Sequence, residues 1–311
     1  MLREMCSGRL GEVEWFRSPW QRGGSATGLA SWSASDGAAI DAFVKFPVGP
    51  REFAWTRALG ASEGDGWEAG ASLPTPRVLA CGESIGPYDL AWIVTERLRG
   101  PALNHGVNEG VVRDLVATAT EFHARALAVR AVSGAGEERD WDALHHQSRD
   151  TLKLGHVPES ARWHDALRHL HKALPRLLAL WGARRMETWC HGDLHPGNAM
   201  RRAARDGGPG RCVLLDMAFV HLGHWVEDAI YLERQFWAHR EVLGTTKPVS
   251  LMARRRRELG LSTSDDYGTL AAVRRVLMAG CVPAWLETEG SAAYAHAALE
   301  VIERNLPGLV R

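Results

Sequence analysis

The stretch His191-Gly192-Asp193-Leu194-His195-Pro196-Gly197-Asn198 decides the interpretation of this 311-residue chain. Its proline and glycine favour a tight turn between Asp193 and Asn198. Further along the chain, an apolar segment ends in Asp216. Short strands on either side of the polar turn Arg205–Gly210 would bring Asn198 and Asp216 together at one end of a hairpin. The spacing therefore predicts two carboxylates and an amide placed to act together.

Carboxylates and an amide in this order suit phosphoryl transfer. That reaction needs an in-line hydroxyl, a metal ion that bridges the phosphates and a carboxylate that takes the hydroxyl proton. Asp193 is the predicted catalytic base. Asn198 and Asp216 are the predicted Mg²⁺ ligands, because oxygen donors suit hard cations. His191 is interpreted as a buried residue that orients the loop. An isolated aspartate before a turn is usually a cap or surface residue, but the joint pattern argues against that reading here.

Around this motif the periodicity changes along the chain. Strands are predicted over Ile40–Phe46, Arg77–Cys81 and Leu90–Thr95, and a short helix over Arg51–Leu59. After residue 100 the pattern becomes helical. The predicted helices are Val111–Val129 with Asn108 as its cap, Ser160–Trp181, Val226–Arg240, Val249–Leu259, Asp265–Ala279 and Ser291–Asn305. The chain is therefore expected to have an α+β fold, with a strand-rich part over residues 1–98 and a helix-rich part over 99–311.

The residues from His191 to Asn198, together with Asp216 and the later Gly223…Glu227-Asp228-Ala229, resemble the signature of the aminoglycoside phosphotransferase and choline kinase family. This family is distantly related to protein kinases. The resemblance implies a bilobal protein-kinase-like fold with an N-terminal nucleotide-binding lobe and a C-terminal catalytic and substrate-binding lobe. It also implies ATP, or in some members GTP, as donor, Mg²⁺ as metal, and phosphorylation of a hydroxyl on a small molecule.

The resemblance also assigns nucleotide contacts in the N-terminal part. Lys45, the first lysine of the chain, matches the strand lysine that neutralises the α- and β-phosphates. Glu52 matches its acidic partner, although an acid in the first turn of a helix is favoured by the helix dipole in any case. Glu68 is a weaker candidate for the same partner.

Two further segments are assigned by position in the family pattern. Gly24 and Ser25 belong to a predicted phosphate-covering loop, Arg22–Gly28, for which a flexible turn is an equal alternative. Backbone groups around Glu96 and Leu98 are predicted to meet the adenine edge.

The chain departs from the family at two places near the site. Met217-Ala218-Phe219 follows Asp216, where relatives often have an aromatic residue directly after the aspartate. A Val-Glu pair precedes Asp228, where an aliphatic or aromatic pair is more usual. Asp228 is expected to remain the buried acid that braces the catalytic loop.

The short segment after Asp216 indicates a small acceptor. Only about ten residues separate it from the next predicted helix, which leaves little room to seat a peptide. A nucleotide-binding, pseudokinase-like regulatory module is the alternative. It is disfavoured because Lys45, Asp193, Asn198 and Asp216 are all present.

The acceptor is expected to be a sugar, an amino sugar or a similar metabolite, and an aminoglycoside is a less favoured candidate. Residues 227–311 hold eleven acids and eleven bases, which is no acidic excess for a polycation. The run Arg254–Arg257 is interpreted as a solvated helix face. A choline- or ethanolamine-type kinase stays open, because aromatic residues could cage a quaternary ammonium. The candidates for that cage are Trp225, Tyr231, Trp237 and Trp285.

Composition limits the expected binding partners and cellular location of the protein. Lys plus Arg and Asp plus Glu number 37 each, so no overall charge attracts nucleic acid or an anionic membrane, and neither is expected as a partner. The five cysteines are scattered, without zinc-site spacing. The first residues lack the apolar core of a signal peptide, and no run reaches the roughly 18 apolar residues of a membrane span. A cytoplasmic protein is expected.

Overall fold

The computed structural model describes residues 1–16, 24–62, 71–134, 136, 139–155, 157–203, 210–263 and 266–310. These residues form two compact units, each built from several segments. The first unit comprises Met1–Gly106, Glu121–Ala131 and His195–Val220, and the second comprises Val107–Thr120, Val132–Leu194 and His221–Arg311. The predicted lobe boundary between residues 98 and 99 stays a prediction, because no single cut separates the units.

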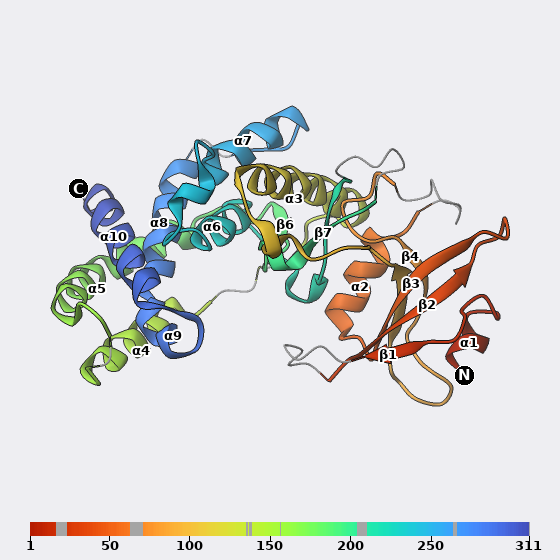
Figure 1. Ribbon diagram of the computed structural model, residues 1–311. Helices are drawn as coiled ribbons and strands as arrows, with labels where there is room; N and C mark the ends of the chain where they lie inside the picture. The colour runs from red at the N-terminus through yellow and green to blue at the C-terminus, as the bar shows by residue number, and fades with distance from the viewer. Residues whose placement is uncertain are drawn as a thin grey trace. The chain divides into compact units, whose positions relative to one another are not determined.

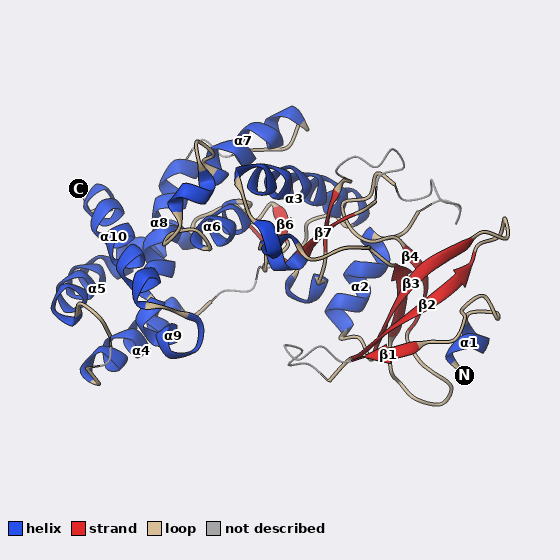
Figure 2. Ribbon diagram, in the orientation of Figure 1, coloured by secondary structure: helices blue, strands red, loops and turns tan. Residues whose placement is uncertain are grey.

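The first unit is built on a five-stranded antiparallel sheet in the order β1-β2-β3-β5-β4 (Figures 1 and 2). Its strands are β1 (Glu14–Phe16), β2 (Ala26–Ser33), β3 (Ala39–Phe46), β4 (Val78–Gly82) and β5 (Trp92–Glu96). The unit also contains α1 (Leu2–Met5), α2 (Pro50–Leu59), η1 (Leu103–Gly106), η2 (Pro196–Asn198), β7 (Ala199–Arg201), β8 (Cys212–Leu214) and η3 (Met217–Phe219). The strands predicted at 40–46, 77–81 and 90–95 and the helix at 51–59 are present.

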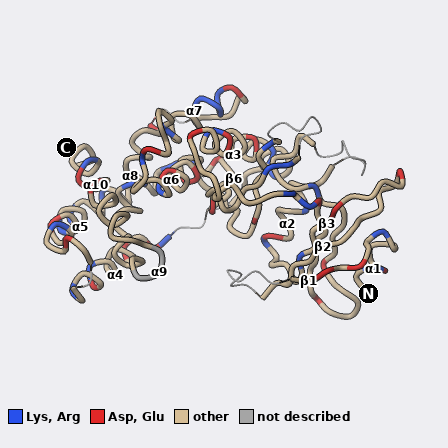
Figure 3. The backbone as a smooth tube through the Cα atoms, in the orientation of Figure 1, with Lys and Arg blue, Asp and Glu red and all other residues tan. Residues whose placement is uncertain are grey.

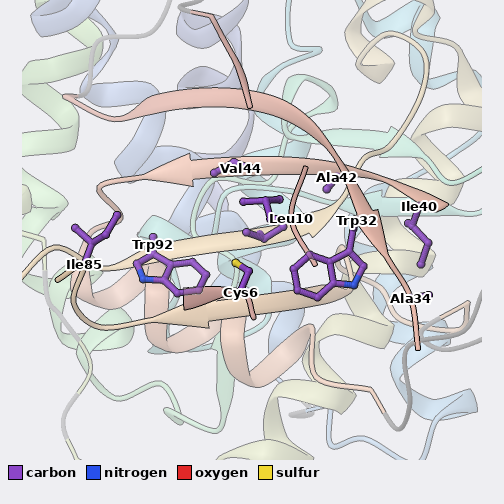
Figure 4. Close-up of a cluster of buried hydrophobic side chains, with 10 residues drawn as sticks. Cys6, Leu10, Trp32, Ala34, Ile40, Ala42, Val44, Ile85 and Trp92 are labelled. Atoms are coloured by element: carbon purple, nitrogen blue, oxygen red, sulfur yellow. The ribbon is translucent and has the colours of Figure 1, made fainter. Parts of the chain in front are cut away.

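Successive side chains of β3 lie on opposite faces of the sheet. Ile40, Ala42 and Val44 are buried in a hydrophobic cluster on one face of the sheet (Figure 4). Residues of opposite parity lie on the other face, where Ile93 of β5 packs in a second cluster with residues around α2. Lys45 is paired in register with Ile93. It therefore lies on the face of the sheet that α2 covers.

The second unit is mostly helical. Its helices are α3 (Glu109–Val129, which continues into the first unit), α4 (Trp141–Lys153), α5 (Ser160–Gly182), α6 (Val226–Arg234), η4 (Arg240–Leu243), α7 (Pro248–Glu258), α8 (Tyr267–Gly280), α9 (Val282–Glu289) and α10 (Ala292–Leu309). The short strands β6 (Thr188–Cys190) and β9 (His221–Gly223) pair beside them. As predicted, Asn108 caps α3, since its Oδ1 accepts from the N–H of Val111 at 3.1 Å.

Three sequence predictions need correction. The helix predicted to reach Arg240 ends at Arg234. Helices α4 and α9 were not predicted. The Arg254–Arg257 run lies on α7 (Figure 3), but Arg256 is buried and donates to the carbonyl of Ser262 and to Thr188 Oγ1. The run is thus not wholly a solvated face. Within the described part of the chain, none of the helices combines the length and apolarity that crossing a membrane requires.

Candidate active site

An ion pair joins the sheet of the first unit to α2. Lys45 Nζ lies 2.5 Å from Glu52 Oε1, and the two side chains are only 25% and 13% exposed. Pro50 at the first position of α2 starts the helix, which places Glu52 in its first turn. The predicted Lys45–Glu52 contact is present. Glu68, the competing partner, lies outside the described residues.

Asp216 sits at the end of the β7–β8 hairpin in a conformation that aspartate seldom adopts. Its φ is 60° and ψ 84°, a left-handed backbone that costs energy for most residues with a side chain. Its Oδ1 accepts from the N–H of Ala218 at 3.2 Å, which caps η3. At the same end of the hairpin, the N–H of Leu215 donates to the carbonyl of Asn198 at 2.8 Å. The hairpin thus brings Asn198 and Asp216 to one end, as the spacing predicts, while most of the turn at 205–210 lies outside the described residues.

The three charges of this region influence one another. Burial raises the pKa of Glu52, the charge of Lys45 lowers it, and the nearby charge of Asp216 raises it again. Helix α2 also packs against η3, which Asp216 caps. Glu52 thus lies within electrostatic reach of one lysine and of a second carboxylate. The oxygen donors of Asn198 and Asp216 fit a hard divalent cation, and a cation beside Asp216 would relieve the repulsion between the two acids.

The residue after Asp216 differs from the pattern of relatives without disturbing the hairpin. Met217 is buried, and Phe219 is 57% exposed. Methionine therefore fills the apolar position that follows the aspartate.

Side chains of the other predicted nucleotide contacts have structural partners. Ser25 Oγ donates to the carbonyl of Pro47 at 2.7 Å. The Glu96 carboxylate pairs with Arg202 at 2.6 Å and accepts from the N–H of Arg77. The predicted backbone contacts of Glu96 and Leu98 with adenine stay predictions.

The end of the predicted phosphate-covering loop is strand rather than loop. Arg22 and Gly23 lie outside the described residues, whereas Ala26 to Gly28 already belong to β2. Gly24 and Ser25 remain as the described part of this segment before the strand.

In the second unit, Asp228 braces the segment before the predicted base. It is fully buried, and its two oxygens accept from the backbone N–H groups of His191 and Gly192 at 2.7 and 2.9 Å. Gly192 has a φ of 82°, which glycine adopts without strain. His191 is buried, and its Nδ1 accepts from the N–H of Asp193 at 3.3 Å. This arrangement agrees with the structural roles expected for Asp228 and His191.

The side chain of Asp193 is held from α6. Tyr231 Oη donates to Asp193 Oδ1 at 2.5 Å. The Arg234 guanidinium lies over the Tyr231 ring, 4.2 Å from its centroid. The sequence offered Tyr231 only as part of an aromatic cage. Its contact with Asp193 joins residues 38 positions apart, and no local pattern signals it.

Glu227, noted as a departure from the family, is the centre of a buried charge network. Its carboxylate lies 3.2 Å from Arg184, 3.7 Å from Arg274 and 3.5 Å from His221 Nε2. Burial alone would raise the pKa of Glu227, but the hydrogen bond from His221 and the two arginines hold it well below its ordinary value. Cys190 Sγ lies close to His221 and Glu227. The two guanidinium charges already neutralise this carboxylate and oppose a metal cation there.

Of the four residues proposed for the aromatic cage, two lie in the core, whereas Trp285 is 43% exposed. Trp225 is fully buried between His224 and Tyr267, and Trp237 is buried and stacked on Tyr294. Tyr231 already carries Arg234 on its ring. Trp225, Tyr231 and Trp237 therefore do not offer the set of exposed aromatic faces that would enclose a quaternary ammonium.

Comparison with known proteins decides the family. The sequence model of the phosphotransferase enzyme family, APH, matches residues 40–271. The chain belongs to this family. The match includes Lys45, Glu52, Asp193, Asn198 and Asp216. A search of proteins with curated functions gave no match to the phosphotransferase.

Solved structures share its protein-kinase-like fold at low identity. An aminoglycoside phosphotransferase from Alicyclobacillus acidocaldarius is 15% identical with a TM-score of 0.56, and the match covers 96% of this chain and 91% of that one. A choline kinase from Cryptosporidium parvum is 8% identical with a TM-score of 0.52, covering 97% and 90%. A spectinomycin phosphotransferase in complex with ADP and spectinomycin is 9% identical with a TM-score of 0.51, covering 95% and 89%.

The phosphotransferase should lose stability in mild acid because of His224, a buried histidine just before α6. Burial lowers the pKa of His224 to about 4, and its Nδ1 accepts from the N–H of Val226 at 3.2 Å, so the folded state needs the neutral ring. Because the unfolded chain takes up the proton near pH 6.5, stability is complete above that pH and falls as the pH drops toward 4. Burial lowers the pKa of His145 in the same way.

Urea unfolding at pH 7 and pH 5 checks this expectation. His224→Asn keeps an acceptor for the Val226 N–H but cannot take up a proton. The variant should lose about 1–2 kcal/mol less than the wild type between the two pH values. An identical loss in both proteins would show that His224 does not contribute.

Proposed function

We propose that this phosphotransferase uses Mg²⁺ and ATP to phosphorylate a hydroxyl group of a small molecule. The observation that carries the proposal is the grouping of Lys45, Glu52 and Asp216 in the first unit. A lysine paired with a partly buried acid, near a second carboxylate, suits an Mg²⁺-bound polyphosphate. The solved structures include an APH(4)-Ia mutant in ternary complex with AMP-PNP and hygromycin B, 15% identical with a TM-score of 0.51, whose match covers 98% of this chain and 96% of that one.

The chemical roles follow from the side chains. Lys45, oriented by Glu52, would neutralise the α- and β-phosphates. Asn198 and Asp216 would hold Mg²⁺, which when bound supplies charge neutralisation at the phosphates. Asp193 would accept the proton of the acceptor hydroxyl as the hydroxyl oxygen attacks the γ-phosphorus; the bond from the γ-phosphorus to the bridging oxygen breaks, and ADP leaves. The proposal requires all these residues to act on one nucleotide. The chain itself limits the separation of the Asp193 and Asn198 α-carbons to about 18 Å.

A sugar, an amino sugar or a similar hydroxylated metabolite is favoured over a polycationic aminoglycoside, because it carries little or no positive charge. The guanidinium of Arg234 lies on the ring of Tyr231, whose hydroxyl contacts Asp193. On the same helix, Glu233 pairs with Arg275 at 2.6 Å, so its charge is compensated. A choline-type acceptor is disfavoured by the burial of Trp225 and Trp237. A nucleotide-binding regulatory module is the second candidate, and turnover distinguishes it from an enzyme.

A screen of acceptors tests the proposal. The purified protein is incubated with Mg²⁺ and either ATP or GTP. The acceptor panel comprises monosaccharides, amino sugars, choline, hygromycin B and spectinomycin. Nucleoside diphosphate release well above the rate without acceptor is expected for a monosaccharide or an amino sugar. Stimulation by choline alone would overturn the acceptor class. Nucleotide binding without any acceptor-dependent release would favour the regulatory module.

Replacing Lys45 tests the nucleotide side. Lys45→Ala should lower kcat/KM for ATP about 10- to 100-fold, because the negative charge of the bound phosphates then lacks the lysine that would neutralise it. Steady-state kinetics with varied ATP measures the change. Lys153→Ala is the matched control, since Lys153 is exposed and pairs only with its neighbour Asp150 along α4 in the contacts shown. Unchanged kinetics in Lys45→Ala would show that Lys45 has no nucleotide role.

A further inference from the structure

We propose that Tyr231 is a positioning residue for the catalytic base and that its hydroxyl orients the carboxylate of Asp193 and keeps it ionised. This inference rests on the proposed function, in which Asp193 takes the acceptor proton. It assigns α6 a direct role in the reaction, through one hydroxyl group.

Helix α6 holds the catalytic segment at two successive turns. Asp228 accepts from the backbone N–H groups of His191 and Gly192. Tyr231, three residues later and therefore on the same face of the helix, donates to the side chain of Asp193. The backbone before the base and the side chain of the base are thus fixed from one rigid element.

Arg234 continues the series at the next turn. It lies three residues after Tyr231, with its guanidinium 4.2 Å from the centroid of the tyrosine ring. A cation at this distance holds the ring by a cation–π interaction. Arg234 therefore packs over the tyrosine ring, while the tyrosine hydroxyl contacts Asp193.

The chemistry of the contact favours a charged acceptor. Tyr231 Oη donates to a carboxylate oxygen of Asp193, and such a bond is stronger when the acceptor is ionised. Burial raises the pKa of Tyr231 to about 12, against the lowering effect of Arg234 and with a further rise from Asp193. Tyrosine is therefore a donor throughout the working pH range. A hydrogen bond donated to the ionised carboxylate stabilises the form that can accept a proton.

The variant Tyr231→Phe removes the hydroxyl and keeps the ring under Arg234. ADP release is measured with Mg–ATP and the best acceptor of the panel, or with water where hydrolysis is the only turnover. We expect kcat to fall about 10- to 100-fold, as for loss of a hydrogen bond to a charged group, with the KM for ATP within about 2-fold. The acid limb of the kcat profile should move to higher pH, because the carboxylate then loses a donor that favours its ionised form. Charged or titratable groups seen beside the pair are Arg234, which contacts the tyrosine, and His191, which contacts the backbone of Asp193.

A double variant separates positioning from a merely structural effect. If Tyr231 acts through Asp193, Tyr231→Phe should change the rate less than about 2-fold in the Asp193→Asn background. Tyr88→Phe removes the hydroxyl of an exposed tyrosine and should leave kinetics unchanged. Thermal unfolding midpoints verify that each variant is folded.

The outcomes distinguish this inference from the function on which it rests. An inactive wild type overturns the proposed function and this inference with it. Activity that Asp193→Asn abolishes but Tyr231→Phe leaves unchanged, in both kcat and pH profile, overturns the role of Tyr231 alone. Equal effects of Tyr231→Phe in the wild-type and Asp193→Asn backgrounds would likewise contradict positioning through Asp193.

Discussion

Replacing Asp193 by asparagine should lower kcat at least about 100-fold, the scale of a lost general base. Asparagine keeps the size of the side chain, and the hydrogen bonds from His191 and Gly192 to Asp228 involve backbone groups that the substitution does not change. What is lost is the charge that accepts the hydroxyl proton. ATP affinity should stay within about 3-fold, because the proposed phosphate contacts are made by other residues.

Rate and binding are measured separately to check this. Steady-state ADP release gives kcat, and calorimetric titration with Mg–ATP gives the Kd. Asp150→Asn is a matched control, since Asp150 is an exposed carboxylate that pairs with Lys153. Near-normal turnover in Asp193→Asn would remove Asp193 from the reaction.

The second large effect concerns Asp216. Asp216→Ala should abolish Mg²⁺-dependent nucleotide binding, because it removes a proposed oxygen ligand. Alanine also deletes the cap on Ala218 and is strained at a φ of 60°, so a loss of binding alone would not separate metal binding from local folding.

Asp216→Asn resolves this ambiguity. Asparagine tolerates the left-handed conformation and can still cap Ala218, but it lacks the charge. Thermal-shift titrations with ATP, with Mg²⁺ and with EDTA, should show the Mg²⁺-dependent part of binding reduced about 10-fold or more. Binding in EDTA should be unchanged. A full Mg²⁺ response in both variants would exclude Asp216 as a ligand.

Local patterns predicted the part of the fold that local physics determines. Residue patterns predicted the strand over residues 40–46 and the short helix that follows it, whereas the pairing of Lys45 with Glu52 was implied by the resemblance to the family. The apolar strand before Asp216 and the turn after Asp193 likewise located the hairpin that aligns Asn198 with Asp216. In each case, elements near in sequence determine the geometry.

The missed features depend on contacts between distant segments. Helix α4 is largely polar, and it is stabilised by the burial of Trp141 and Leu152 and by the Asp140 cap rather than by an obvious apolar stripe. The partners of Glu227 come from residues 184 and 274, far along the chain in both directions. The burial of Arg256 similarly depends on Thr188 and Ser262. Residue type and spacing cannot select such partners before the helices pack.

The central claim is that the protein transfers the γ-phosphoryl group to a small-molecule hydroxyl. The most direct measurement is mass spectrometry of the acceptor after reaction with Mg–ATP, with ADP measured in the same sample. We expect one phosphorylated acceptor for each acceptor-dependent ADP in the wild type, and none in Asp193→Asn. An acceptor that stays unmodified across the whole panel, while the protein binds Mg–ATP, would contradict the central claim.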